Sequence, residues 1–482
     1  MENVNELIQL RLKKLEEIKN NNIDAYGARY ERAHTAQSAK ESFKDNKKQK
    51  IKIAGRITAV RTHGKVAFLD IKDESGRLQL YVKEGVINDD GLWLFKRLDI
   101  GDIIGAEGIL FKTRMGEITV EVHALKMLAK SLKPLPEKWH GLKDVEARYR
   151  QRYLDLIAND EVKDIFRVRT KAINKIREVL NTKGYMEVET PMMHPVPGGA
   201  AGRPFKTHHN TYDADFYLRI APELYLKKLL VGGFEKIYEL NRSFRNEGVS
   251  TRHNPEFTML EVYEAYADFE DMMRLTEELI SSVVKEITGS YTLDYQGKTI
   301  DLKPPWQRRS FAEAIGIDPA ENTPNAWKKI LADKFGLDIK EGISRSALLN
   351  LAEDLLDEQP QNKPTFFTDY FTEVSPLAKT RADKPFLAER FELFIGGMEI
   401  ANAYSELNDP QEQARRIKKQ HKEDEDKLHK IDNDFLTALE YGMPPAGGLG
   451  IGIDRLIMLI TDKASIREVL LFPLLKPEDD NI

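Results

Sequence analysis

The 482-residue sequence predicts an α+β protein with a small closed β-barrel, followed by a larger domain whose antiparallel sheet is flanked by helices. Three observations predict this class. Five short segments between about residues 51 and 130 alternate apolar and polar side chains, which is the period of a half-buried strand. Two longer hairpin patterns follow, at 236–266 and 391–406. Helical patterns at 165–183 and 268–287 lie outside these hairpins and would cover the sheet.

Composition places the chain among globular proteins and excludes several classes of site. Charged residues make up 31% and hydrophobic residues 41% of the sequence. The formal net charge of −5 gives no global basic field, so any RNA contact must be local. The absence of cysteine excludes disulfides and thiolate metal sites. The first residues lack a signal pattern and no apolar run is long enough to span a bilayer, so we expect a cytoplasmic protein without a membrane partner.

The first twenty residues predict a helix. Leu7, Leu12, Leu15 and Ile18 fall near helical spacing, and basic residues occupy the other face. A polar, lysine-rich stretch follows, up to Lys52. Two interpretations stay open for these basic residues: a solvated helix with a linker, or a basic rim that contacts RNA phosphates.

The five alternating segments predict a barrel of the OB type. They are separated by turn residues at 63–64, 75–76 and 115–116. Barrels of this type bind single-stranded nucleic acid on aromatic platforms beside polar side chains that read bases. Phe68 and Gln79 lie on consecutive predicted strands and could play these two roles. Phe68 could instead fill the barrel core, as most buried aromatics do.

A proline-bearing stretch, KPLPEK at 133–138, predicts a linker between domains. We therefore expect an N-terminal domain at 1–135, a hinge at 136–150 and a second domain at 151–482. The second domain opens with an amphipathic helix that ends at Gly184, followed by a strand that ends at Pro191.

A loop of small residues at 194–205 then leads to a strand and helix. It lacks the phosphate-binding pattern G-x-x-x-x-G-K-[ST], but Gly199 permits close approach of the backbone to a ligand. Glu223 lies in the first turn of the following helix, where a carboxylate also suits the helix dipole.

The hairpin at 236–266 carries the densest group of candidate site residues. Alternation directs Leu260 and Val262 into the core, and it directs Phe257, Glu261 and Tyr263 to the opposite face. Arg245 and Glu247 lie at the strand end beside that second face. An arginine neutralises phosphate or carboxylate and an aromatic ring stacks on a base, so this face suits a nucleotide and an amino acid.

Residues 319–363 predict a helical insertion between strands of the sheet, without residues of evident chemistry. The second hairpin, at 391–406, turns at Gly396–Gly397. A two-residue turn would pair Glu392 with Ala401 and make Glu392 and Glu399 diagonal neighbours, about 7–8 Å apart at Cβ.

Two carboxylates at that separation repel unless a cation lies between them, and Mg²⁺ bridging to nucleotide phosphates would suit them. The alternative is a solvated hairpin edge. Asn402, Tyr404 and Glu406 have the opposite strand parity to Glu399, so we predict a bulge near Ala401 that brings them to one face.

A glycine-rich strand at 447–452 enters the last long helix. Asp454 is the expected N-cap, which puts Arg455 at the first helical position. A cation there opposes the helix dipole, so an anion such as a triphosphate is expected nearby. Pairing with a surface carboxylate is the alternative.

These segments together resemble the three motifs of the class II aminoacyl-tRNA synthetases, and most closely those of the lysyl members. The helix, strand and proline at 165–191 resemble motif 1, which builds the dimer interface in that family. FRNE followed by RHNPEFTMLEVY, at 244–263, resembles motif 2. GIGIDRL, at 450–456, resembles motif 3. The class I motifs HIGH and KMSKS do not occur.

The resemblance implies a homodimeric ligase that joins lysine to tRNA(Lys) with ATP and Mg²⁺. It implies that Arg245 and Arg455 are the catalytic arginines and that the OB barrel reads the anticodon. The implied residues are Arg245, Glu247, His253, Phe257, Glu392 and Arg455 for ATP; Gly199, Glu223, Glu261, Tyr263, Asn402, Tyr404 and Glu406 for lysine; Glu392 and Glu399 for Mg²⁺; and Phe68, Gln79 and nearby Arg61 for the anticodon.

Other activities stay open at this point. Aspartyl and asparaginyl synthetases share this architecture, but their substrates require a cation where this pocket offers carboxylates. A protein lysylase would lack the barrel. A catalytically inactive RNA-binding relative would not need Arg245, Glu392, Glu399 and Arg455.

Overall fold

The computed structural model describes residues 2–45, 47–136, 142–317, 324–336, 339, 347–349, 351–353, 363–423 and 431–478. The chain folds into two compact units, Met1–Lys143 and Asp144–Ile482. Residues 137–141 of the predicted linker, and most of the predicted insertion at 319–363, lie outside the described residues.

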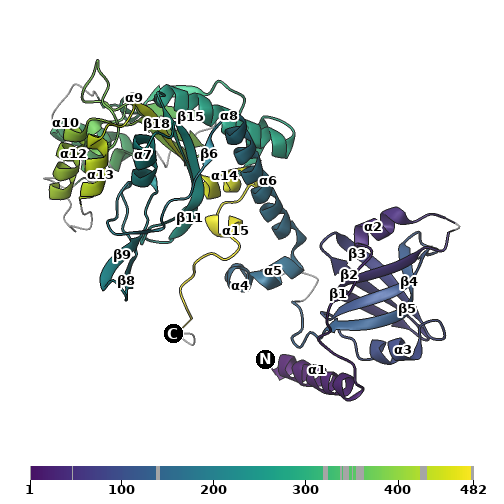
Figure 1. The fold of residues 1–482 in the computed structure, drawn as a ribbon. Helices are drawn as coiled ribbons and strands as arrows, with labels where there is room; N and C mark the ends of the chain where they lie inside the picture. The colour runs from purple at the N-terminus through teal and green to yellow at the C-terminus, as the bar shows by residue number, and fades with distance from the viewer. Residues whose placement is uncertain are drawn as a thin grey trace. The chain divides into compact units, whose positions relative to one another are not determined.

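The N-terminal unit is a closed five-stranded barrel, as the sequence predicted (Figure 1). Its strands follow the order β1-β2-β3-β5-β4, in which only the β3–β5 pair is parallel. Alternate side chains fill the interior, so the apolar–polar alternation of the sequence becomes an inside and an outside. The elements are α1 (Glu2–Asn20), α2 (Ala36–Ser42), β1 (Lys50–His63), β2 (Val66–Asp73), β3 (Gly76–Lys83), α3 (Asp89–Phe95), β4 (Ile103–Lys112) and β5 (Ile118–Ala129).

Helix α1 packs on this unit with Leu15 and Ile18 buried, while Leu7 is 42% exposed. The sequence predicted that the basic residues, Arg11 among them, lie on the face opposite the apolar residues, and for Arg11 this was wrong. Arg11 is buried and donates to the carbonyls of Ile100, Ser131 and Lys133. A guanidinium carries enough donors to satisfy several carbonyls at once, which lets it be buried without a carboxylate.

The second unit is built on an eight-stranded sheet of order β14-β15-β16-β17-β18-β11-β10-β6. Neighbouring strands are antiparallel except for the two outermost pairs, β14–β15 and β10–β6, which are parallel. The predicted α+β class is therefore confirmed. The strands are β6 (Met186–Glu187), β10 (Lys236–Phe244), β11 (Glu256–Ala265), β14 (Gln307–Ser310), β15 (Thr365–Thr368), β16 (Arg390–Ile395), β17 (Met398–Ser405) and β18 (Ala446–Gly452).

Long helices cover one face of this sheet and bury its main core. Helices α6 and α8 pack beside one another, and their apolar faces join Leu260 and Val262 of β11 in one cluster. The helices of this unit are α4 (Val145–Arg150), α5 (Arg152–Ala158), α6 (Asp160–Thr182), α7 (Glu223–Val231), α8 (Phe269–Thr288), α9 (Phe311–Ile315), α10 (Pro324–Phe335), α12 (Pro410–Glu423), α13 (Asn433–Glu440), α14 (Ile453–Ile460) and α15 (Ile466–Val469).

Smaller sheets complete the second unit: β7 (Met193–His194), β9 (Ala214–Leu218) and β8 (Lys206–His209) form one, and β12 (Thr292–Tyr295) with β13 (Lys298–Asp301) forms another. The predicted insertion contributes α10, and Trp327 of that helix packs in a separate core with Phe311 and Phe371. Among the residues that the structure describes, every helix is too short or too polar to cross a lipid bilayer.

The predicted cap of α14 was wrong. The helix begins at Ile453, with Gly452 as its N-cap, so Asp454 lies inside the first turn. Its carboxylate accepts hydrogen bonds from Arg169 Nη1 at 2.6 Å and from the Thr258 amide at 2.7 Å. Asp454 thus ties α14 to α6 and β11, a tertiary role that the helix-start pattern could not reveal.

Candidate active site

The floor of the candidate site is a row of glycines on β18, which lies between β11 and β17. Gly448 is paired with Tyr263 on one side and Tyr404 on the other, and Gly450 is paired with Glu261 and Asn402. A Cβ at Gly448 would overlap the Glu406 carboxylate and lie 2.8 Å from the Tyr263 ring. The missing side chains therefore leave a trough between two rows of polar groups.

One end of this trough is acidic. Glu223, Glu261 and Glu406 are 6%, 6% and 1% exposed. The Tyr404 hydroxyl donates to Glu223 Oε1 at 2.6 Å, and the Tyr263 hydroxyl donates to Glu261 Oε2 at 3.2 Å. The structure thus gathers most of the predicted lysine-binding residues around one pocket.

A residue that the sequence did not single out enters this pocket. Lys227 Nζ lies 2.6 Å from Glu223 Oε1 and 2.5 Å from Glu406 Oε2. Glu406 Oε1 has no hydrogen-bond partner within the described residues. The predicted binding residue for a substrate ammonium is therefore already paired with an ammonium of the chain through one oxygen.

Burial raises the pKa values of two of these carboxyls, Glu261 and Glu406. Burial first, and then the charge of Glu223, raises the pKa of Glu261 to about 8. Burial also raises the pKa of Glu406 to about 8, although the Lys227 ammonium acts in the opposite direction. Carboxyls in this state hold protons near neutral pH unless a further cation arrives.

Gly199 contributes to the pocket by its backbone. Its φ of +89° lies in the left-handed region, and a Cβ there would approach the Glu223 Cβ at 3.2 Å. Both restrictions require glycine at this position. The loop can therefore lie directly against the first turn of α7.

The other end of the trough is formed by the loop between β10 and β11. The Arg245 guanidinium lies 5.2 Å from the centre of the Phe257 ring, and its Nε has no partner among the residues described. Burial lowers the pKa of Arg245, and the carboxylates of Glu247, Glu399 and Glu261 oppose that effect. Arg245 is partly buried, and within the described residues its Nε keeps a donor that an anionic ligand could use.

Arg455 and His253 meet beside this arginine. Arg455 Nη1 donates to Glu399 Oε2 at 2.9 Å and to the Glu399 carbonyl at 2.8 Å. His253 Nε2 lies 3.1 Å from Arg455 Nη2, and its Nδ1 lies 3.0 Å from Ser250 Oγ. Because arginine only donates, Nε2 must be the acceptor and the imidazole is neutral. Burial and the Arg455 charge accordingly lower the pKa of His253.

The two predicted magnesium ligands lie on one face of the β16–β17 hairpin. The predicted pairing of Glu392 with Ala401 was wrong, because Glu392 pairs with Asn402 and Leu393 with Ala401. The register shifts next to Phe394, which pairs with Glu399 and leaves Ile400 as the extra residue. The predicted bulge near Ala401 is thus present, and it brings Glu399, Asn402 and Tyr404 to the same side.

Glu392 is enclosed by a polar network. Its Oε1 pairs with Arg390 Nη2 and accepts from Asn402 Nδ2 at 3.1 Å, and its Oε2 accepts from the Tyr370 hydroxyl at 2.8 Å. Burial raises the pKa of Glu392, Arg390 opposes this, and the Glu399 charge adds to it. Two oxygen donors with mutual repulsion suit a hard cation, provided that other ligands complete its shell.

The barrel carries the predicted anticodon residues on its outer surface. Phe68 is partly exposed, so it does not fill the core, and its ring lies 5.1 Å from that of Tyr81. Tyr81 lies in turn 5.7 Å from Phe111. Gln79 Oε1 accepts from Thr119 Oγ1 at 2.9 Å. Arg61 makes a two-fold contact with Asp70, at 3.0 and 3.1 Å.

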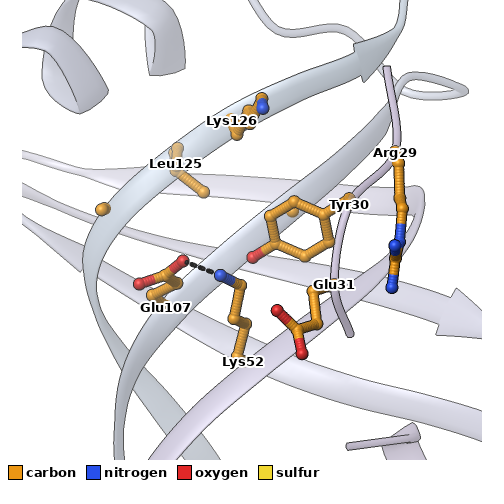
Figure 2. Close-up of a pocket in the computed structure, with 9 residues that line it drawn as sticks. Arg29, Tyr30, Glu31, Lys52, Glu107, Leu125 and Lys126 are labelled. Atoms are coloured by element: carbon orange, nitrogen blue, oxygen red, sulfur yellow. Dashed lines mark ion pairs between the residues drawn. The ribbon is translucent and has the colours of Figure 1, made fainter. Parts of the chain in front are cut away.

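A separate hollow lies on this barrel over β1, β4 and β5 (Figure 2). The Tyr30 ring covers Gly105, where a Cβ would approach it at 2.5 Å. Lys52 pairs with Glu107 at 2.9 Å and lies 5.1 Å from the centre of the Tyr30 ring. These contacts fasten the segment before α2 to the barrel.

Comparisons with known proteins decide the family. Residues 144–476 match the family model described as "tRNA synthetases class II (D, K and N)", and residues 51–128 match "OB-fold nucleic acid binding domain". The chain is 54% identical to the lysine–tRNA ligase of Pelotomaculum thermopropionicum, over 99% of this chain and 96% of the relative. It is 54% identical to that of Carboxydothermus hydrogenoformans, over 99% of both, and 50% identical to that of Moorella thermoacetica, over 100% of both.

The chain belongs to the class II lysine–tRNA ligases. The predicted resemblance is confirmed, and the chain is an aminoacyl-tRNA ligase. The two family matches follow the order that the sequence predicted, with the barrel before the synthetase domain.

Sequence reasoning missed several residues of this lysine–tRNA ligase site. Lys227 stands four residues after Glu223, and that helical spacing places both on one face of α7. Gly448 and Gly450 alternate on a strand, which is a signal that one of its faces lies open. Arg390 precedes Glu392 by two residues on β16 and so shares its face. Each signal was available, but only as a pattern shared with ordinary surface residues.

Proposed function

We propose that this chain activates lysine with ATP and transfers the lysyl group to the 3′ end of tRNA(Lys). The observation that carries the proposal is the charge of the pocket on β18. Glu223, Glu261 and Glu406 are all buried there, and the ammonium of Lys227 pairs with two of them, Glu223 and Glu406. Buried charges are tolerated only when they are paired, so the pocket favours a ligand that brings positive charge.

In this proposal lysine lies along the glycine trough. Its side-chain ammonium meets Glu406, with Tyr263 as a neighbour, and its α-amino group meets Glu223 and Glu261. Asn402, Tyr404 and Gly199 complete the pocket. Glu406 supports this direction of binding, because its buried carboxyl group enters the space beside Gly448 and has no hydrogen-bond partner among the described residues.

ATP occupies the arginine end. Arg245 contacts the α-phosphate and the lysine carboxylate, Phe257 lies under the adenine, and Arg455 holds the γ-phosphate. Glu247 and His253 complete the nucleotide site. Phosphoryl transfer requires positioning and neutralisation of charge more than a protein nucleophile. The unpartnered Nε of buried Arg245 supports an anion at this place.

Mg²⁺ would be held by Glu392 and Glu399 together with phosphate oxygens. The ion neutralises the triphosphate when it is bound. The two carboxylates lie on one hairpin face, and the charge of Glu399 adds to the burial that raises the pKa of Glu392, which supports a shared cation. The chain alone supplies too few ligands for octahedral Mg²⁺, so binding should require ATP.

The barrel reads the anticodon through Phe68, Gln79 and Arg61. A domain division at 1–135 and 151–482, joined by a hinge at 136–150, is part of this proposal. The partly exposed rings of Phe68, Tyr81 and Phe111 form a row of the kind on which bases stack. A cytoplasmic location fits an enzyme that charges tRNA for protein synthesis.

The protein acts as a homodimer in this proposal. The segment around β6 carries three exposed methionines, Met186, Met192 and Met193, beside α6. Exposed apolar residues of this kind favour a covered surface. Sedimentation equilibrium at micromolar concentration should give twice the chain mass of 55.3 kDa. A clean monomer would contradict the dimer without touching the activity.

The activity is tested by ATP–pyrophosphate exchange, run separately with each amino acid. We expect exchange with lysine and background rates with aspartate and asparagine. Exchange with aspartate or asparagine would instead support the related synthetases that share this fold. Absence of exchange with every amino acid would support an inactive relative.

A further inference from the structure

Lys227 is the one buried ammonium in the described part of the acidic pocket. Its side chain is 0% exposed. It stands one turn after Glu223 on α7 and contacts a carboxylate oxygen of Glu223 and one of Glu406. The rings of Tyr404 and Phe435 lie 5.5 and 6.0 Å from its Nζ. A lysine is almost never buried so fully unless it is paired.

The two oxygens of Glu406 have different surroundings. Oε2 lies against Lys227, whereas Oε1 lies over Gly448, where a side chain would overlap it. Both oxygens are buried and neither has a hydrogen bond within the part of the chain that the structure describes, so the ion pair of Oε2 with Lys227 is the contact that holds the carboxyl group. Lys227 therefore holds the Glu406 carboxylate through Oε2, while Oε1 lies on the side of Gly448.

We infer that Lys227 is a positioning residue for substrate lysine, because its ammonium contacts a carboxylate oxygen of both Glu223 and Glu406 and so holds the Glu406 carboxyl group beside Gly448, where the substrate ammonium is proposed to bind. This inference rests on the proposed function. It explains why a pocket for a cation contains a cation of its own. Without Lys227, Glu223 and Glu406 would lose their common counter-charge, and Glu406 would hold its proton more strongly. A protonated Glu406 cannot form the ion pair that selects lysine.

The groups that face Lys227 are Glu223 from its own helix, Glu406 after β17, Glu261 and Tyr263 from β11, and Tyr404 from β17. Burial alone would lower the pKa of Lys227, but Glu223 and Glu406 hold it above its ordinary value. Burial and the neighbouring carboxylates raise the pKa values of Tyr263 and Tyr404 well above the usual range. Lys227 thus stays charged and both tyrosines stay neutral between pH 6.5 and 9.

The test compares Lys227→Met with Lys228→Met in lysine-dependent ATP–pyrophosphate exchange. Lys228 is the matched control, because it lies on the same helix and pairs with Asp434 at 2.6 Å, away from the pocket. Loss of a close cation raises a carboxyl pKa by about one to three units. Lys227→Met should therefore raise KM for lysine at least about tenfold at pH 7. KM for ATP should change less than about threefold.

The pH profile separates positioning from folding. The variant carboxyl ionises only as pH rises through about 9 and above, so its KM for lysine should fall between pH 7 and pH 9 but stay above that of the parent. Lys228→Met should match the parent throughout. Overturning results would be a lysine KM within about twofold of the parent at pH 7, or an equal, pH-independent loss toward both substrates.

A second variant covers the case in which Lys227→Met fails to fold. Lys227→Met/Glu406→Gln removes both charges of the pair, so it leaves no stranded partner. If Lys227 acts through Glu406, the double variant should bind lysine no worse than Glu406→Gln alone. A further tenfold loss would overturn the inference. Failure of the parent itself to exchange with lysine would instead reject the proposed function.

Discussion

The two ends of the β18 trough differ in their balance of charge. At the arginine end, Arg390 pairs with Glu392 and Arg455 pairs with Glu399, while Arg245 lies near Glu247. At the acidic end, Glu223 and Glu406 share the ammonium of Lys227, and Glu261 lies close to Glu223 without an ion pair to Lys227 among the described residues. The first end is close to neutral, and the second lacks positive charge.

This difference in charge balance indicates which part of a substrate the arginine end and the acidic end each accept. A site with matched charges can exchange its partners when an anion and a metal ion arrive together. A buried site short of cations must acquire one or hold protons. The raised pKa values of Glu261 and Glu406, both about 8, indicate that the empty pocket holds protons. Lysine can replace them.

The largest effect is expected at the acidic end. Glu406→Gln removes the proposed partner of the substrate ammonium and strands Lys227 as well. Breaking a buried pair costs about 3–5 kcal/mol, so kcat/KM for lysine in exchange should fall by roughly two to three decades. The KM for ATP should change little. If lysine is activated nearly as well as by the parent, another group recognises its ammonium.

The next effect is expected at the arginine end. Glu399→Gln weakens a charge-assisted contact with Arg455 and removes one proposed metal ligand. Such contacts contribute about 1.5–3 kcal/mol, so exchange at limiting Mg²⁺ should fall roughly 10- to 100-fold with the fold intact. Excess Mg²⁺ should restore part of the rate. A rate near that of the parent at limiting Mg²⁺ would contradict the metal assignment.

A smaller effect is expected outside the catalytic unit. Phe68→Ala should weaken tRNA charging by about 1–3 kcal/mol, the contribution of one stacked base, and should leave exchange with lysine unchanged. Tyr30→Ala is a suitable control, because that ring covers Gly105 in the separate hollow of Figure 2. Equal loss of charging and exchange in Phe68→Ala would contradict the division of labour between the units.

Much of the fold could be predicted because local patterns carry it. Alternation located the barrel strands, and Gly396–Gly397 located the turn between β16 and β17. The bulge was predictable because Glu399 and Asn402 had to share a face. The length of β6 was not, since a strand of two residues depends on its neighbour β10 rather than on its own sequence.

The site was harder to predict, because partners in a buried network come from distant parts of the chain. Asp454 looked like a cap and proved to bind Arg169 and Thr258. Lys227 looked like one of two adjacent surface lysines, and only the position of Glu406, far along the chain, shows that it is buried in an ion pair. Sequence patterns predict which residues share a face of a helix or strand, but they do not predict which distant residues pack against that face.

The charge deficit of the acidic pocket is tested most directly by the protons that lysine displaces. Below pH 8 the carboxyls of the empty pocket hold protons, and the incoming ammonium stabilises their charged forms, so binding must release protons. Calorimetric titration at pH 7, in two buffers of different ionisation enthalpy, measures the number of protons released for each lysine that binds. We predict that lysine releases about one proton more than norleucine, because norleucine keeps the α-ammonium that meets Glu261 but lacks the side-chain ammonium that meets Glu406, and that this difference falls toward zero above pH 9. Binding of lysine at pH 7 without proton release, or equal affinity for norleucine, would contradict the account.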